Sequence, residues 1–242
     1  MKLCDNFLVF LPYEGFDIWK YDTLTGEWTV DKITILNLYK NLGTAAYGNI
    51  AYSCVYFNGC LWIVTGCSDY LLKYNVNTGE SELHKNGVDK YVYTYITADE
   101  NRLYLLDNIN NIIAITNDGI DCMVIKIQTS LIKKYWNTEN GELCLFKAVL
   151  NVGNYIVLIP AFSDTFIKIN KITNEQSAIN THFLDNADGC FNGYNPEYSY
   201  STGAFAVLNS YEFIVQRTYD GKAAVINVDD INTENVEAGN CR

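Results

Sequence analysis

Two histidines and eight cysteines are the side chains of this sequence that are best suited to metal binding or nucleophilic chemistry. His84 and His182 lie far apart in the chain. Neither belongs to an H-x-x-x-H or H-E-x-x-H spacing, which would place two imidazoles on one metal ion. We therefore expect both to be solvated histidines of loops.

The cysteines also lack the spacing of a metal site. Cys60 and Cys67 form a close pair, but they are further apart than in C-x-x-C and no matching C-x-x-C pair exists elsewhere. A strand rises about 3.3 Å per residue, so a strand between them would keep the two thiols apart. The first residues do not resemble a secretory signal peptide. We expect a cytoplasmic protein with free thiols, and we expect Cys60 and Cys67 to be core thiols.

Other motifs of catalysis and cofactor binding are absent from the sequence. It contains no G-x-S-x-G, no phosphate-binding loop and no G-x-G-x-x-G. Asp118-Gly119 and Asp220-Gly221 are typical of turns and not of calcium loops. Asp229-Asp230, with Asn232 and Glu234, is either a cation site or a solvated turn. The sequence thus predicts no catalytic residue, no metal site and no cofactor.

The charge of the chain restricts its partners. The formal net charge is −11, and no run of lysine or arginine offsets it. Nucleic acid and acidic membrane surfaces would be repelled, which leaves a cation, a sugar or a protein as partner. No stretch approaches the roughly 18 apolar residues of a membrane span.

A repeat supplies the scaffold for these residues. Each copy has an apolar run, a short polar turn, a second run that ends in Asp or Asn, and a turn rich in Thr, Asn and Gly. The five copies are Phe7–Trp28, Leu61–Ser81, Leu103–Asp121, Tyr155–Ser177 and Phe213–Asn235. Further apolar runs flank the copies, so that each unit has four antiparallel strands in about 50 residues.

A four-stranded meander of this period is typical of a propeller blade. The sequence predicts an all-β fold, a β-propeller of about five four-stranded antiparallel blades, over one domain at residues 1–242. The repeats fall approximately at 1–37, 38–87, 88–130, 131–184 and 185–242. A β-sandwich and a β-solenoid are the alternative folds. A sandwich does not require internal repetition, and a solenoid turn is usually shorter.

The first copy has few residues before it. Only MKLCDN precedes Phe7, and the tail after Val228 provides one short strand, around residues 235–238. Either the first blade lacks its inner strand or the chain is part of a longer protein. An uncovered sheet edge could recruit a partner strand.

Two segments resemble bacterial kelch-like propeller repeats. They are Trp19–Trp28, W-K-Y-D-T-L-T-G-E-W, and Asn58–Glu80, which begins N-G-x-L-W-x-V and ends Y-N-V-N-T-G-E. Tyr21 and Trp28 match the tyrosine and tryptophan of the kelch pattern, whereas its paired glycines are missing. The resemblance implies a propeller fold and no particular activity, because propellers host many functions.

Three connections between repeats are candidates for binding. They cover residues 38–49, 130–142 and 185–203, and loops of this length are uncommon unless they are functional or disordered. Their aromatic and amide side chains suit protein or sugar recognition. The candidate binding residues are Tyr39, Tyr47, Tyr135, Trp136, Asn137, Phe191, Tyr194, Tyr198 and Tyr200.

The sequence therefore predicts a non-catalytic interaction module that presents an aromatic loop face to a protein or peptide partner. One alternative is that these aromatics fill the wide end of the ring, and another is a lectin-like propeller that binds carbohydrate. A third is a propeller-type lyase, because LWIVTG at residues 61–66 resembles repeats of antibiotic-cleaving lyases. That resemblance implies a histidine beside acidic groups and a metal, a place that His182 would have to take.

Overall fold

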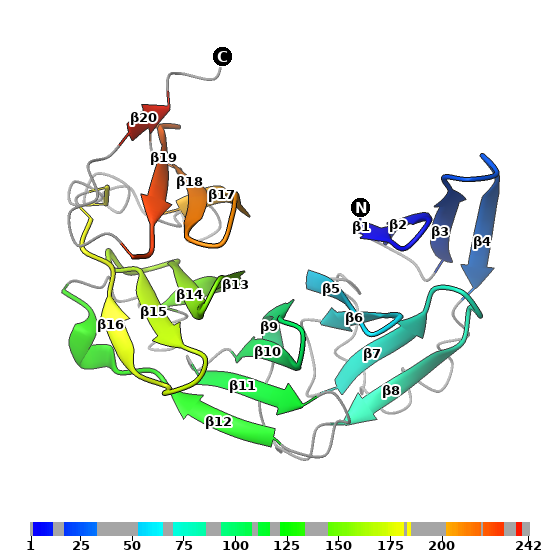
Figure 1. The fold of residues 1–242 in the computed structure, drawn as a ribbon, viewed down its shortest axis with the longest axis horizontal. Helices are drawn as coiled ribbons and strands as arrows, with labels where there is room; N and C mark the ends of the chain where they lie inside the picture. Colours follow the sequence, from blue (N-terminus) through cyan, green and yellow to red (C-terminus); the bar gives the residue numbers. More distant parts are fainter. Residues whose placement is uncertain are drawn as a thin grey trace. The chain divides into compact units, whose positions relative to one another are not determined.

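The computed structural model describes the strands and most of their turns. The described residues are 2–11, 17–32, 53–64, 70–85, 93–107, 111–116, 122–133, 145–181, 183–184, 202–218, 220–229 and 236–238. They form five four-stranded antiparallel sheets, which are the predicted blades (Figure 1). The chain divides into two compact units, Met1–Val124 and Ile125–Arg242. One domain over residues 1–242 stays a prediction.

The first unit contains blades 1 to 3. Blade 1 consists of β1 (Lys2–Cys4), β2 (Phe7–Phe10), β3 (Asp17–Asp22) and β4 (Trp28–Lys32), and blade 2 of β5 (Ser53–Phe57), β6 (Cys60–Val64), β7 (Tyr70–Asn75) and β8 (Ser81–Lys85). Blade 3 consists of β9 (Tyr93–Ala98), β10 (Arg102–Asp107), β11 (Asn111–Thr116) and β12 (Cys122–Lys126), the last of which ends just beyond the unit.

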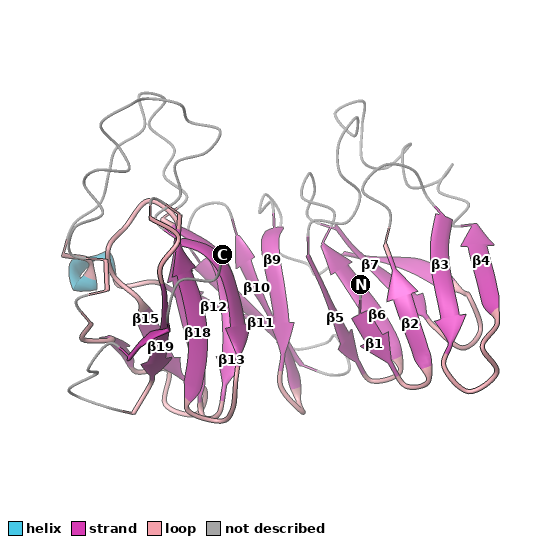
Figure 2. Ribbon diagram, turned by 90° about the horizontal axis from the view of Figure 1, so that it is seen from above, coloured by secondary structure: helices cyan, strands magenta, loops and turns pink. Residues whose placement is uncertain are grey.

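The second unit contains blades 4 and 5. Blade 4 consists of β13 (Phe146–Val152), β14 (Tyr155–Pro160), β15 (Ile167–Asn170) and β16 (Gln176–Ala178), and blade 5 of β17 (Thr202–Val207), β18 (Glu212–Arg217), β19 (Ala223–Asn227) and β20 (Val236–Ala238). A short 3-10 helix, η1 (Thr129–Leu131), is the one helix among the described residues (Figure 2). In every blade neighbouring strands follow chain order, so each blade is a meander.

Blade 1 corrects one expectation from the sequence. Its inner strand is present, because β1 pairs with β2 through Lys2 opposite Val9 and Cys4 opposite Phe7. Only three residues form this strand, too few for an alternating pattern to reveal it. Blade 1 therefore has four strands and is not three-stranded.

A hydrogen-bonded turn joins the third strand to the fourth in blades 1, 2 and 4. In blade 2 the side-chain oxygen of Asn75 accepts the N–H groups of Asn77 and Thr78 at 3.0 and 3.1 Å. The Thr78 hydroxyl accepts the N–H of Glu80 at 3.3 Å, and Gly79 has a φ of +75°, which glycine adopts without strain. Equivalent bonds form the turns at residues 22–27 and 170–175. The predicted turns that start at Asp or Asn are confirmed there.

The core of the first unit lies between its blades. Leu61 and Ile63 of β6 pack into a cluster shared with blade 1, whereas Trp62 and Val64 pack into one shared with blade 3. All five residues of β6 are buried, which is typical of a continuous apolar run in a strand covered on both faces. Burial of each large apolar side chain contributes about 1.5–3 kcal/mol, so contacts between blades stabilise the unit.

A lysine of the third strand ties neighbouring blades together within each unit. In the first unit, the Lys20 ammonium donates to the carbonyl oxygen of Val76 at 3.0 Å and pairs with Asp31 at 2.7 Å. In the second unit, Lys168 of β15 donates to the carbonyl oxygen of Val228. Both lysines stand two residues before the Asp or Asn that starts the turn.

Candidate functional site

The nine residues predicted to bind a partner lie outside the described residues. They are Tyr39, Tyr47, Tyr135, Trp136, Asn137, Phe191, Tyr194, Tyr198 and Tyr200. His182, Cys67, Asp230, Asn232 and Glu234 lie outside them as well. The aromatic loop face and the histidine site of the lyase alternative therefore stay predictions.

His84 differs from its expected place in a solvated loop. It lies on β8, opposite Leu71, and its ring meets the Trp62 ring edge-on with centroids 5.4 Å apart. Because side chains alternate along a strand, this register turns His84 towards the face that blade 2 packs against blade 3. His84 is thus a half-buried strand residue, and its Nε2 has no hydrogen-bond partner among the residues that the structure describes.

The described thiols do not form a metal centre. Cys60 lies buried on β6, where burial raises the pKa of its thiol. The expectation that Cys60 is a core thiol is confirmed. Among the described residues, no group of three or more His, Cys, Asp or Glu side chains is placed to hold a metal ion. In that same part of the chain, no helix has the length and apolar character needed to cross a bilayer.

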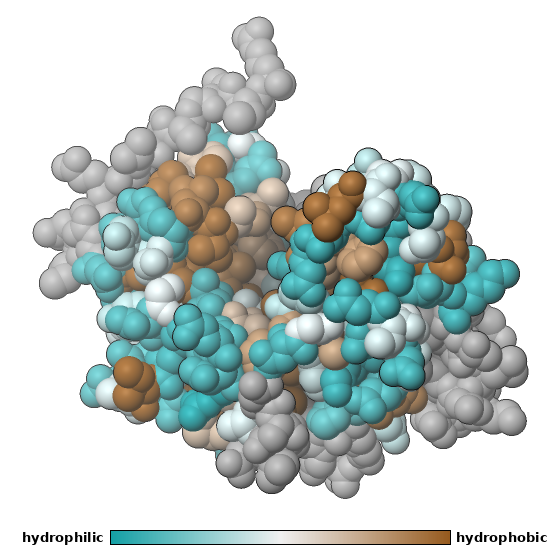
Figure 3. All heavy atoms as spheres, turned by 45° about the vertical axis from the view of Figure 1, so that its right-hand side comes forward, coloured by the Kyte–Doolittle hydropathy of each residue, from teal (hydrophilic) through white to brown (hydrophobic). Residues whose placement is uncertain are grey.

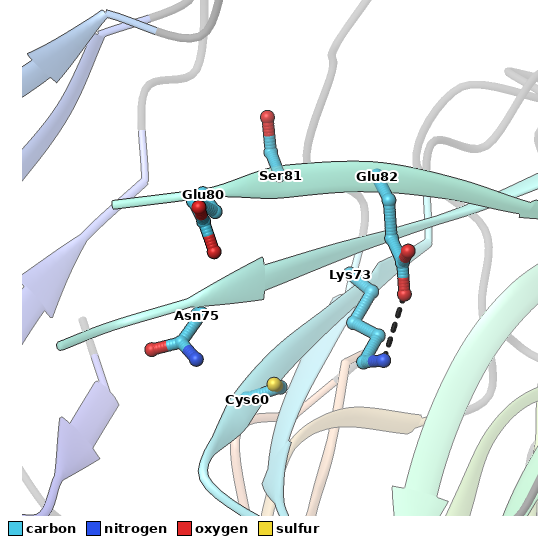
Figure 4. Close-up of a pocket in the computed structure, with 6 residues that line it drawn as sticks. All are labelled: Cys60, Lys73, Asn75, Glu80, Ser81 and Glu82. Atoms are coloured by element: carbon cyan, nitrogen blue, oxygen red, sulfur yellow. Dashed lines mark hydrogen bonds and ion pairs between the residues drawn. The ribbon is translucent and has the colours of Figure 1, made fainter. Parts of the chain in front are cut away.

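A polar pocket of about 500 Å³ opens on the outer half of blade 2 (Figure 4). It is lined by Cys60, Lys73, Asn75, Glu80, Ser81 and Glu82. The lining residues come from three adjacent strands and the turn between β7 and β8. Strand pairing places Cys60 opposite Asn75 and Lys73 opposite Glu82. We call this the blade 2 pocket.

An ion pair fixes the charges in the blade 2 pocket. Lys73 Nζ lies 2.7 Å from Glu82 Oε1 and 5.5 Å from the centre of the Trp62 ring. The hydrogen bond raises the pKa of Lys73 and lowers that of Glu82. Both groups are therefore charged near neutral pH, and neither is poised to exchange a proton there. The pair favours binding through charge and hydrogen bonds over acid–base catalysis.

Blade 1 exposes a second candidate surface on its sheet. Trp19 and Trp28 are 48% and 56% exposed, and Val30 is 38% exposed. The Trp28 ring lies 5.4 Å from the ring of Phe10 and 5.1 Å from that of Tyr21. Strand pairing places Trp19 beside Phe10 and Val30, and Trp28 beside Tyr21. We call these five residues the blade 1 aromatic face.

The sequence contained signals for both surfaces that were not assigned to binding. Tyr21 and Trp28 match the kelch-like pattern, and no sequence motif marks Lys73 or Glu82. Several apolar side chains are exposed among the hydrophilic residues of the surface (Figure 3). Sequence alone does not show which face of a blade a neighbour covers, because that depends on tertiary packing.

Comparisons with known proteins show the architecture. No known family matches the sequence, and no curated protein does. Virginiamycin B lyase from Staphylococcus aureus superposes with a TM-score of 0.59 at 13% identity, over 90% of this chain and 61% of the lyase. The chain has the β-propeller fold. It spans less than two thirds of that lyase, and at this identity the likeness shows the fold alone.

Two further structures agree. An inactive variant of the same lyase with quinupristin gives a TM-score of 0.54 at 13% identity, over 94% of this chain and 69% of that one. A chain of the nidogen/laminin complex gives a TM-score of 0.56 at 9% identity, over 97% of this chain and 75% of that one. The kelch-like relationship stays a prediction, because these neighbours are propellers of other kinds.

Proposed function

We propose that this protein is a non-catalytic module that binds a protein or peptide partner. The blade 1 aromatic face carries this proposal. Tryptophan and tyrosine are enriched among the residues that dominate protein interfaces, because they bury a large rigid surface at low entropic cost. Here two half-exposed tryptophans lie side by side with a phenylalanine and a tyrosine on one sheet.

The remaining observations are consistent with binding. The ionised groups of the blade 2 pocket are stable ion-pair partners rather than proton donors. A propeller with a similar fold belongs to a complex of two proteins. The cytoplasm is the compartment we propose, and a net charge of −11 disfavours nucleic acid as the partner.

The test is capture of partners by immobilised protein from a lysate of the cells that produce it. We expect the Trp19→Ser/Trp28→Ser variant to lose the partners that wild type recovers, because both anchors of the face are removed. Leu24→Ser is the matched control, since Leu24 is 75% exposed on the turn of the same blade. If the double variant recovers the same partner proteins as wild type, the proposal is wrong.

Two assays address the alternative functions. Specific binding on a glycan array, with no protein partner recovered, would replace the proposal by a lectin-like one. Cleavage of quinupristin by the purified chain would replace it by a lyase.

A further inference from the structure

The blade 1 aromatic face occupies strand positions that form a junction between blades elsewhere in the chain. Trp19 matches Leu72 of blade 2, because each stands three residues before the residue that starts the turn. Tyr21 and Tyr74 each stand one residue before it. Leu72 and Tyr74 are buried in the cluster where blade 2 packs on blade 1. The blade 1 aromatic face thus has the position of a junction face, yet Trp19 is 48% exposed.

The second unit has the same kind of junction between blades 4 and 5. The residues of blade 5 at the matching positions are all buried: Phe213, Val215, Ala224 and Ile226. The ring of Phe213 lies 5.7 Å from that of Phe166, which directly precedes β15 of blade 4. Phe166 matches Ile18 of blade 1, since each stands four residues before the residue that starts the turn. Both junctions therefore join the side of one blade that carries Ile18 or Phe166 to the matching buried face of the next blade.

Blade 5 carries a face of the first of these two kinds on its other side. Ile214, Ala223 and Val225 are half-buried, and they alternate along β18 and β19 with the buried residues of the junction. Ala223 stands at the position of Ile18, four residues before Asn227. Strand pairing places Ile214 opposite Val225. We call Ile214, Ala223 and Val225 the blade 5 apolar face.

The two faces complement each other in size and charge. The blade 1 aromatic face contains two tryptophans, whereas the blade 5 apolar face contains an alanine and a valine on one strand. Large side chains opposite small ones fill a contact at the density of a protein interior. Val225 also stands where blades 1 and 4 have Lys20 and Lys168, so this face brings no charge out of water to cover the tryptophans.

We infer that the blade 1 aromatic face of one copy of this protein packs on the blade 5 apolar face of a second copy. The contact repeats between two chains the junction that blades 1 and 2, and blades 4 and 5, form within one chain. It joins two different surfaces, so the copies associate head to tail. The inference rests on the proposed function, because it names the protein partner of the same face.

Sedimentation velocity of the purified full chain at increasing concentration tests the association. We expect wild type to pass from monomer to dimer and longer species. Trp19→Ser/Trp28→Ser removes the anchors of one face, and Val225→Glu places a carboxylate on the other, so each variant should stay monomeric where wild type associates. Leu24→Ser is the matched control and should associate like wild type, because Leu24 lies on the turn of blade 1. Far-ultraviolet circular dichroism like that of wild type shows that each variant is folded.

A mixture of the two monomeric variants distinguishes this contact from other arrangements. The tryptophan variant retains its blade 5 apolar face, and Val225→Glu retains its blade 1 aromatic face. The mixture should therefore form a one-to-one dimer and no larger species. If two aromatic faces met instead, Val225→Glu would associate by itself like wild type. That result, a mixture that stays monomeric, or a wild type that is monomeric at about 100 μM would overturn the inference.

Failure of this experiment is distinguishable from failure of the proposed function. Self-association is measured on purified protein, whereas the proposed function is measured by capture of partners from a lysate. If purified wild type stays monomeric while the Trp19→Ser/Trp28→Ser variant still loses its captured partners, only the assignment of a second copy is wrong.

Discussion

Lys147 carries an amine buried in the second unit. Its Nζ donates to the carbonyl oxygen of Gly203 at 2.6 Å and to that of Thr202, and it lies 5.4 Å from the centre of the Phe205 ring. Burial lowers the pKa of this amine from 10.5 to about 8. The lysine thus joins β13 to β17 and is less basic than an ordinary lysine.

This pKa predicts how stability changes with pH. In the folded state Lys147 loses its proton near pH 8, whereas in the unfolded chain it keeps the proton until about pH 10.5. Between these values the unfolded chain binds more protons, so the free energy of unfolding rises with pH through this residue. Below about pH 8 both states are protonated and the contribution is flat.

The measurement is the thermal midpoint of wild type and of Lys147→Met between about pH 7 and about pH 10.5. Other groups titrate in both proteins, so the difference between the two curves isolates Lys147. We expect wild type to gain stability relative to the variant as pH rises. Parallel curves would contradict the lowered pKa.

The third-to-fourth-strand turns were the best predicted elements. An Asp or Asn followed by Thr and Gly contains its own hydrogen-bonding partners within six residues, so local sequence decides the geometry. Strand β1 was missed because three residues are too few to show an alternating pattern. The strand position of His84 was missed because its burial depends on a neighbouring blade. Both candidate surfaces were missed for the same reason.

Two glycines in equivalent turns give an element-scale prediction. Gly26 and Gly79 have φ values of +74° and +75°, so alanine at either carries the same backbone penalty, about 1–2 kcal/mol. A Cβ on Gly26 would lie 3.8 Å from the Tyr21 hydroxyl, in ordinary contact. A Cβ on Gly79 would lie 3.0 Å from a carboxylate oxygen of Asp31 in blade 1.

We expect Gly79→Ala to destabilise the protein more than Gly26→Ala. The added methyl group must displace Asp31, which pairs with Lys20 and accepts the Tyr74 hydroxyl across the junction of blades 1 and 2. The free energies of unfolding in urea measure both effects. Equal losses would mean that Asp31 moves aside at no cost, and that the junction is looser than its contacts indicate.

At the scale of the whole molecule, equivalent repeat positions have different surroundings. Trp19 and Leu72 both stand three residues before the residue that starts the turn. Leu72 is 1% exposed in the cluster between blades 1 and 2, whereas Trp19 is 48% exposed. Burial therefore differs between equivalent positions of the repeat, which is why similar copies can form both a core and an exposed aromatic surface.

This difference predicts that substitution by alanine destabilises the protein to very different extents at the two positions. Leu72→Ala leaves a cavity and should cost about 2–5 kcal/mol. Trp19→Ala removes a larger side chain, yet it should cost only about 0.5 kcal/mol, because Trp19 is half exposed. Urea unfolding followed by circular dichroism measures both without relying on tryptophan fluorescence. A loss for Trp19→Ala as large as for Leu72→Ala would show that the blade 1 aromatic face is covered in solution and is not available to a partner.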